Sequence, residues 1–159
     1  MIVVSDTSPL NYLILIELSH ILPPLFERVV IPRAVRRELE SAEAPDQIKQ
    51  FLATEPEWLE TREALEIEPK LQRLDPGERE AIAIALAISA DLVLLDERKG
   101  RKAAREHGLA VSGTLRVLDL AAKRGLVSLP DAIKRLQRTT FRASPRLIGH
   151  VLASEKDYR

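Results

Sequence analysis

The segments Ile2-Val3-Val4-Ser5-Asp6 and Leu92-Val93-Leu94-Leu95-Asp96 are both short apolar runs that end in an aspartate. Continuous runs rich in Val and Leu are typical of strands in a parallel sheet that helices cover on both faces. Ligands of such sheets bind beyond the carboxyl ends of the strands, so both carboxylates are expected to face one crevice. Because converging carboxylates without a basic partner repel each other, the pattern indicates a bound cation, most simply a hard divalent metal.

Strand and helix patterns alternate along the rest of the chain. Further strands are expected at 28–31, 58–61 and 109–111. Ser8 is the expected N-cap of the first helix, with Pro9 at its first position. The expected helices are 8–18, 20–25, 32–40, 46–54, 75–89, 98–107, 113–123, 130–138 and 144–153, with Gly108 and Gly125 as helix ends. This alternation predicts an α/β fold, a three-layer α/β/α sandwich with a mostly parallel central sheet and a helical C-terminal tail.

The composition limits the classes of function. The chain has 159 residues, of which 45% are hydrophobic and 30% charged, as expected for one folded domain. It contains no cysteine, which excludes disulfides, thiolate nucleophiles and cysteine-ligated zinc. The longest apolar stretch, 81–88, is too short for a membrane span, and 1–20 lacks the basic start of a signal peptide. We therefore expect a cytoplasmic protein without a membrane partner.

The charge is unevenly distributed although the net charge is zero. Residues 38–78 hold 12 acidic against 4 basic side chains, and 79–159 hold 16 basic against 9 acidic ones. Two stretches, 98–105 and 134–146, carry basic charges only. Such runs are commonly solvated helix faces, but beside an acidic crevice they can hold nucleic-acid phosphates. The candidates for this role in the first stretch are Arg98, Lys99, Arg101 and Lys102.

Each candidate carboxylate also has a purely structural interpretation. Asp6 and Asp96 can serve as turn or capping residues, although both occupy the same position, the end of a buried strand. Glu38 flanks the buried helix face that Val35 and Leu39 form, but an exposed glutamate on a helix needs no function. The two aspartates together therefore carry more weight than any of the three alone.

Glu78 has the strongest structural alternative. Asp75-Pro76-Gly77-Glu78 matches a capping box, with Asp75 as N-cap and Glu78 as its partner. The helix that follows is apolar nearly all round over 81–87, so its first turn is expected near the strand ends. Glu80 is the competing acid of this turn and ranks below Glu78.

Four motifs, taken in this order, resemble those of PIN-domain nucleases. They are Asp6-Thr7-Ser8, Ile31-Pro32 with Glu38-Leu39, Gly77-Glu78 before Ala81-Ile82-Ala83, and Leu94-Leu95-Asp96; Gly113-Thr114-Leu115 with Gly125-Leu126 also matches. The likeness covers 1–127 and is closest to a prokaryotic branch that resembles the toxins of type II toxin–antitoxin pairs. Residues 128–159 are expected to form a helical C-terminal extension packed on the same domain.

The resemblance implies a function and a set of site residues. Asp6, Glu38, Glu78 and Asp96 would be the acidic quartet that binds Mg²⁺ or Mn²⁺ in an endoribonuclease, and Thr7 and Thr114 would position a water or phosphate. It also implies an RNA substrate, a homodimer and a small antitoxin protein as partner. The chemistry is consistent, because metals held by carboxylates can activate water and stabilise phosphate charge without a protein nucleophile.

Several alternatives remain open at this stage. Many family members have aspartate where this chain has Glu78, so the number and spacing of metals are undecided. Glu97 follows Asp96 directly and could exchange roles with it. A PIN-like fold with weak or lost catalysis that binds RNA or protein is the alternative function. A haloacid-dehalogenase phosphatase needs a second aspartate where Ser8 stands, and a phospho-receiver domain needs an acidic pair where Thr7 follows Asp6.

Overall fold

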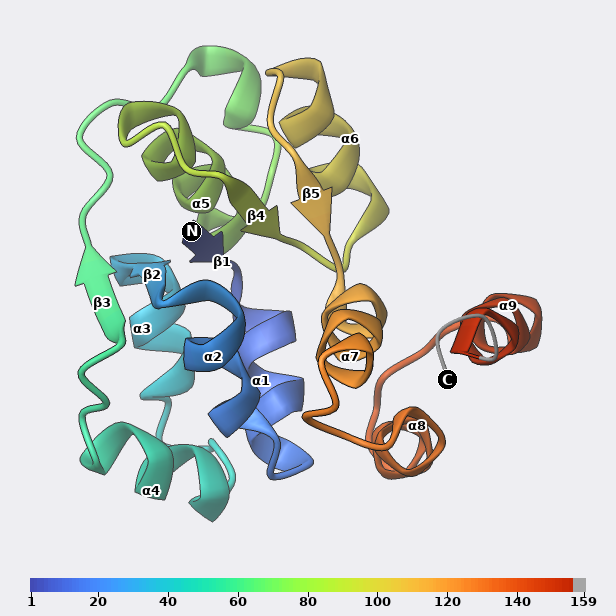
Figure 1. Cartoon of the computed structure of the whole chain (residues 1–159). Helices are drawn as coiled ribbons and strands as arrows, with labels where there is room; N and C mark the ends of the chain where they lie inside the picture. Colours follow the sequence, from blue (N-terminus) through green and yellow to red (C-terminus); the bar gives the residue numbers. More distant parts are fainter. Residues whose placement is uncertain (156–159) are drawn as a thin grey trace.

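A computed structural model describes residues 1–155 and shows a five-stranded parallel sheet between layers of helices (Figure 1). The strands are β1 (Ile2–Ser5), β2 (Arg28–Pro32), β3 (Leu59–Arg62), β4 (Leu92–Leu94) and β5 (Val111–Ser112), in the order β3-β2-β1-β4-β5. Every pairing is parallel. The predicted α/β/α sandwich is confirmed, and all five strands of its sheet run parallel.

The helices follow the strands in the predicted alternation. They are α1 (Thr7–Leu15), α2 (Leu22–Phe26), α3 (Arg33–Leu39), α4 (Asp46–Ala53), α5 (Pro76–Ala87), α6 (Arg98–Glu106), α7 (Thr114–Lys123), α8 (Leu129–Gln137) and α9 (Pro145–Glu155), with short 3-10 turns η1 (Ser19–Ile21) and η2 (Pro69–Leu71). Apart from the helix ends discussed below, the element bounds agree with the sequence prediction to within two residues.

Successive strand residues point to opposite sides of the sheet. Because these residues are apolar on both sides, helices cover both faces. Val3 and Val29 are buried in one cluster with α1, α2, α4, α7 and α8. Val4, Val30 and Val93 are buried in a second cluster with α5 and α6. In α8, Leu129, Ala132, Ile133 and Leu136 join the first cluster, and α9 contacts α7 and α8.

The topology places a crevice at the ends of β1 and β4. These two strands are neighbours, but α1 continues from β1 to one face of the sheet, whereas α6 continues from β4 to the other. This is the topological switch point at which parallel α/β sheets bind ligands. Asp6 directly follows β1, and its N–H donates to the Leu94 carbonyl at 3.0 Å, while Asp96 lies two residues beyond β4.

The prediction of Ser8 as the first N-cap is wrong. The N-cap is Asp6, whose backbone is extended, and α1 begins at Thr7. Asp6 can fill this position because its N–H is bonded to the neighbouring strand, so the chain turns into the helix immediately after the sheet. Pro9 still lies in the first helical turn, where its missing N–H has no cost.

Two helices end two or more residues earlier than predicted, and the cause is the same. α1 ends at Leu15 instead of Leu18, and α5 ends at Ala87 instead of Ser89. Glu17 and Ser89 adopt the left-handed conformation that helices use to stop, with φ of 61° and 50°. Each end is closed by backbone bonds of the Schellman type, such as Leu18 N–H to the Leu13 carbonyl at 2.8 Å. Since glycine usually marks this motif, Glu and Ser gave no sequence signal.

In residues 1–155, no single helix has the length and apolarity to cross a membrane. The pair Thr7–Leu15 and Ser19–Phe26 would meet the criteria together, but it is bent by 117°.

Candidate active site

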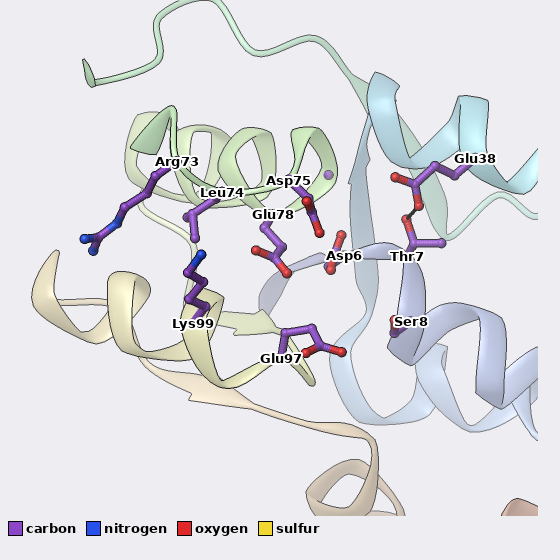
Figure 2. A pocket seen from close by; sticks show the side chains of 11 residues that line it. Asp6, Thr7, Ser8, Glu38, Arg73, Leu74, Asp75, Glu78, Glu97 and Lys99 are labelled. Carbon is purple, nitrogen blue, oxygen red and sulfur yellow. Dashed lines mark hydrogen bonds between the residues drawn. The ribbon is translucent and has the colours of Figure 1, made fainter. Parts of the chain in front are cut away.

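An acidic pocket of about 320 Å³ opens at the switch point (Figure 2). Its lining residues are Asp6, Thr7, Ser8, Glu38, Arg73, Leu74, Asp75, Gly77, Glu78, Glu97 and Lys99. Five of these carry carboxylates and only two, Arg73 and Lys99, carry cations. Three of the four predicted acids, from the residue after β1 and from α3 and α5, therefore line one pocket.

Asp6 is the most perturbed carboxylate of the pocket. Its side chain is only 7% exposed, and burial raises its pKa from 3.8 to about 7. The Thr7 backbone N–H lowers this pKa, whereas the charges of Glu78, Glu38 and Asp96 raise it further. A buried carboxylate among other carboxylates favours proton or cation binding, because either removes the uncompensated charge.

Glu78 is buried as well, and its side chain points into the pocket (Figure 2). Burial is the main cause of its raised pKa, followed by the charges of Asp75 and Glu97. Asp75 is the N-cap of α5 as predicted, but its side chain makes no capping hydrogen bond. The Asp75 half of the predicted capping box is therefore absent, whereas a hydrogen bond from the Asp75 backbone lowers the pKa of Glu78, as the Glu78 half of the box would. Glu80 is half-buried and is not among the residues that line the pocket.

Glu38 lies at the exposed side of the pocket and is bound by Thr7. The Thr7 hydroxyl donates to Glu38 Oε2 at 2.5 Å. This bond joins the first turn of α1 to the last turn of α3 (Figure 2). Thr7 thus orients a carboxylate in this structure, and its contact with water or phosphate stays a prediction.

Asp96 is fixed beside the pocket by the second predicted hydroxyl residue. Thr114 donates its N–H to Asp96 Oδ1 and its hydroxyl to Asp96 Oδ2, both at 2.7 Å. Burial raises the pKa of Asp96, while these two bonds and the charge of Arg101 lower it. Neither Asp96 nor Thr114 lines the pocket, whereas Glu97 does. The structure thus places Asp96 close enough to act on Asp6 electrostatically and leaves Glu97 as the pocket-facing acid of this segment.

Thr114→Val tests the hold on Asp96. The hydroxyl is fully buried, so we expect its loss to cost about 1–3 kcal/mol of folding free energy by leaving an Asp96 oxygen without its donor. The measurement is the free energy of unfolding in urea. Thr114→Ser keeps the hydroxyl, so it should retain more of this stability than Val; equal losses in both variants would contradict the role of the bond.

Two glycines allow the backbone to approach the acids closely. A Cβ on Gly77 would lie 2.6 Å from Asp6 Oδ1, and one on Gly113 would lie 2.8 Å from Asp96 Oδ1. Both distances are shorter than a non-bonded contact permits. The first turn of α5 therefore reaches Asp6 only because position 77 has no side chain.

Gly77→Ala is expected to displace the Asp6 carboxylate more than it unfolds the protein. Alanine is favoured over glycine in a helix, which offsets part of the crowding. We expect the affinity for Mn²⁺ to fall about 10–100-fold, the range seen when groups that orient metal ligands are changed. Titration calorimetry measures the affinity and thermal melting the stability. Gly149→Ala, at a position with open space, is the matched control. Unchanged Mn²⁺ affinity in Gly77→Ala would contradict the prediction.

The donor atoms suit a hard divalent cation. All the acidic groups offer oxygen, and none of the three histidines lines the pocket. Mg²⁺ and Mn²⁺ prefer such oxygen ligands, and Mg²⁺ retains several waters, so few carboxylates are needed. Among residues 1–155, no group of three His, Asp or Glu side chains is already arranged to coordinate a metal. The pocket therefore suits a divalent metal by the type and location of its oxygen atoms, and not by a preformed coordination geometry.

The basic residues divide into three groups. Lys99 lines the pocket, Arg101 acts on the charge of Asp96, and Arg98 and Lys102 are exposed on α6. No residue of 134–146 lines the pocket. Arg73 and Asp75 do, and sequence reasoning assigned neither to the site; Asp75 was recognised only as a cap, and Arg73 belongs to no motif.

The fold and this pocket define a parallel α/β protein with an acidic, nuclease-like site at its switch point. The chain belongs to the PIN-domain family DUF3368, which matches residues 2–157. PIN domains are generally nucleases, and they typically use divalent metals.

A solved structure supports the fold. The chain is similar to a PilT N-terminus domain protein, SSO1118, from the hyperthermophilic archaeon Sulfolobus solfataricus P2. The TM-score is 0.54 at 20% sequence identity, and the match covers 74% of this chain and 90% of that one. No curated protein gives a significant match.

Proposed function

We propose that the protein is a metal-dependent endoribonuclease that hydrolyses RNA phosphodiester bonds. The observation that carries the proposal is the convergence of Asp6, Glu38, Glu78 and Glu97 on one pocket at the switch point, with Asp6 nearly fully buried. Burying Asp6 and Glu78 next to further carboxylates costs free energy unless a cation or proton compensates them. A site for proton transfer alone would not need so many carboxylates.

Asp6 and Glu78, the two buried acids, would hold the cation at the base of the pocket. Glu38 and one of the two adjacent acids, Asp96 or Glu97, would complete the site. A bound divalent metal supplies a water of lowered pKa and stabilises negative charge on the phosphate. Glu38, held by Thr7 at the exposed side, would accept the proton of the attacking water. Lys99, at the rim of the pocket, would bind a non-bridging phosphate oxygen. Thr114 keeps the Asp96 carboxylate in one orientation.

The test is a cleavage assay on mixed RNAs with Mg²⁺, Mn²⁺ or EDTA, with Asp6→Asn and Asp96→Asn as companion variants. Cleavage by the unmodified protein that stops in EDTA and in Asp6→Asn supports the proposal. Cleavage that survives EDTA or either variant refutes the site assignment. RNA or protein binding without any cleavage would favour the alternative, a PIN-like binding module with weak or lost catalysis.

We further propose a toxin-like role in the cytoplasm, with a homodimer as the active form and a small antitoxin protein as inhibitor. The support is the likeness of the acidic motifs to those of type II toxins. A small reading frame beside the gene, whose product blocks RNA cleavage by this protein, is the expected finding. A lone gene would favour a housekeeping nuclease, and light scattering of the purified protein tests the dimer.

A further inference from the structure

A second pocket, of about 460 Å³, shares Arg73 with the acidic pocket. Its other charged or titratable lining residues are Lys70 from η2 and Lys102, Glu106 and His107 from α6 and its end. Figure 2 shows Arg73 and Lys99 on one side of the acidic pocket and Glu38 on the other. The acidic pocket is therefore bordered on one side by cations that lead into the second pocket.

These cations are only weakly neutralised. Glu106 is shared between Arg73, at 3.8 Å, and Lys102, at 4.0 Å, and both cationic side chains are well exposed. By contrast, the cations of α7 are close to their partner: Arg116 and Lys123 lie 2.7 Å and 3.0 Å from the buried Asp119 carboxylate. A long contact between exposed groups stabilises little, so Arg73 and Lys102 can exchange Glu106 for a stronger anion.

Nearby groups leave the second pocket positive. The Glu68 carboxylate is bound to His107 Nε2 at 2.7 Å, and the hydrogen bonds of His107 to Ala103 and Glu68 raise its pKa. Lys70 has no ion pair among residues 1–155. Three cations therefore face one shared carboxylate in this pocket.

We propose that Lys70, Arg73 and Lys102, called the basic wall below, bind a backbone phosphate next to the one that lies in the acidic pocket. The inference rests on the proposed nuclease function and deepens it by assigning the course of the single-stranded substrate: from the acidic pocket, past Arg73, between η2 and α6. A strand entering an acidic pocket needs cations close by, because its other phosphates are repelled by the carboxylates.

The basic stretch 134–146 is the competing path for the strand. It belongs to α8, α9 and their connection, which pack beside α7 (Figure 1). No residue of this stretch lines either of the two pockets. A strand with one phosphate in the acidic pocket therefore meets the basic wall first.

The experiment compares two double variants with the same change of charge. Arg73→Gln/Lys102→Gln removes two cations of the basic wall, and Lys134→Gln/Arg146→Gln removes two exposed cations of the tail. Fluorescence anisotropy of a short labelled single-stranded RNA in EDTA gives Kd over a series of salt concentrations. We expect the wall variant to weaken binding about tenfold and to reduce the slope of log K against log salt by roughly 0.7, the value for one phosphate that is no longer neutralised.

The controls make the outcome decisive. Arg73→Lys/Lys102→Arg should bind as the unmodified protein does, and single-stranded DNA should lose affinity for the wall variant as RNA does, because the contacts are to phosphates. An unchanged salt slope in the wall variant, a larger loss in the tail variant or a loss confined to RNA would overturn the proposal. Absence of cleavage with Mg²⁺ or Mn²⁺ despite wall-dependent binding would refute the nuclease proposal instead.

Discussion

Asp6→Asn is expected to reduce RNA cleavage at least about 100-fold and to remove measurable Mn²⁺ binding, while the folded protein stays intact. Asn keeps the shape of the side chain but removes the charge that a divalent cation would compensate. Since the Asp6 carboxylate is buried beside Glu78, Glu38 and Asp96, its removal also relieves repulsion in the metal-free protein. The variant should therefore be at least as stable as the unmodified chain above neutral pH.

The measurements are initial cleavage rates, Mn²⁺ titration calorimetry and thermal melting. Asp46→Asn, an exposed aspartate in the first turn of α4, makes the same chemical change away from the pocket and should leave cleavage and Mn²⁺ binding unaltered. Substantial cleavage by Asp6→Asn would contradict the central role of this residue. A destabilised Asp6→Asn above neutral pH would show instead that the charge of Asp6 is compensated in the metal-free fold.

The metal-free protein is expected to lose stability as the pH rises from about 4 to about 7. The pKa of Asp6 is raised from 3.8 to about 7 in the folded state, so between these values the folded chain binds more protons than the unfolded one. Stability therefore falls with rising pH across this window and levels off above it. Asp6 accounts for a few kcal/mol of this loss at most. Glu78 and Asp96, whose pKa values are also raised, add to the loss with the same sign.

Divalent metal should reverse this trend. Because a cation binds the ionised carboxylates, its stabilisation of the fold grows as the pH rises. Melting temperatures at several pH values, with EDTA or excess Mg²⁺, measure both effects. The raised pKa of His107 also lowers the stability of the fold as the pH rises. The difference in melting temperature between the unmodified protein and Asp6→Asn therefore isolates the contribution of Asp6. Equal pH profiles in the two proteins would contradict the assignment to Asp6.

The predictable part of the fold rests on local patterns. The runs ending in Asp6 and Asp96 predicted two buried strands, because burial on both faces leaves an uninterrupted apolar sequence, and the structure pairs these strands as neighbours. The ends of α6 and α7 were also predicted, since Gly108 and Gly125 supply the left-handed residue directly. Where Glu17 and Ser89 adopt this conformation, the prediction ran past the helix end, because surrounding contacts impose a conformation that their side chains do not favour.

For the candidate site, the sequence predicted the acidic residues but not the residues that bind them. Asp6 was chosen from its position at a strand end, Glu78 from a helix start and Glu38 from its place beside a buried helix face, and the structure brings them to one pocket. Their functional roles stay predictions until the variants are measured. Local sequence could not reveal that Thr7 binds Glu38, 31 residues away, or that Thr114 binds Asp96, 18 residues away. Such partners depend on how the helices pack.

The amino-acid pattern alone indicated a parallel α/β sheet and an acidic crevice at its carboxyl edge, because periodicity and strand-end position are local properties. The tertiary structure decided which charges share that crevice. It placed Glu97 in the pocket and Asp96 against Thr114, although the two residues are adjacent in the chain, because consecutive side chains point in different directions. It also brought Arg73 to the rim, where no motif pointed to it, since contacts between segments distant in sequence arise only when the helices pack on the sheet.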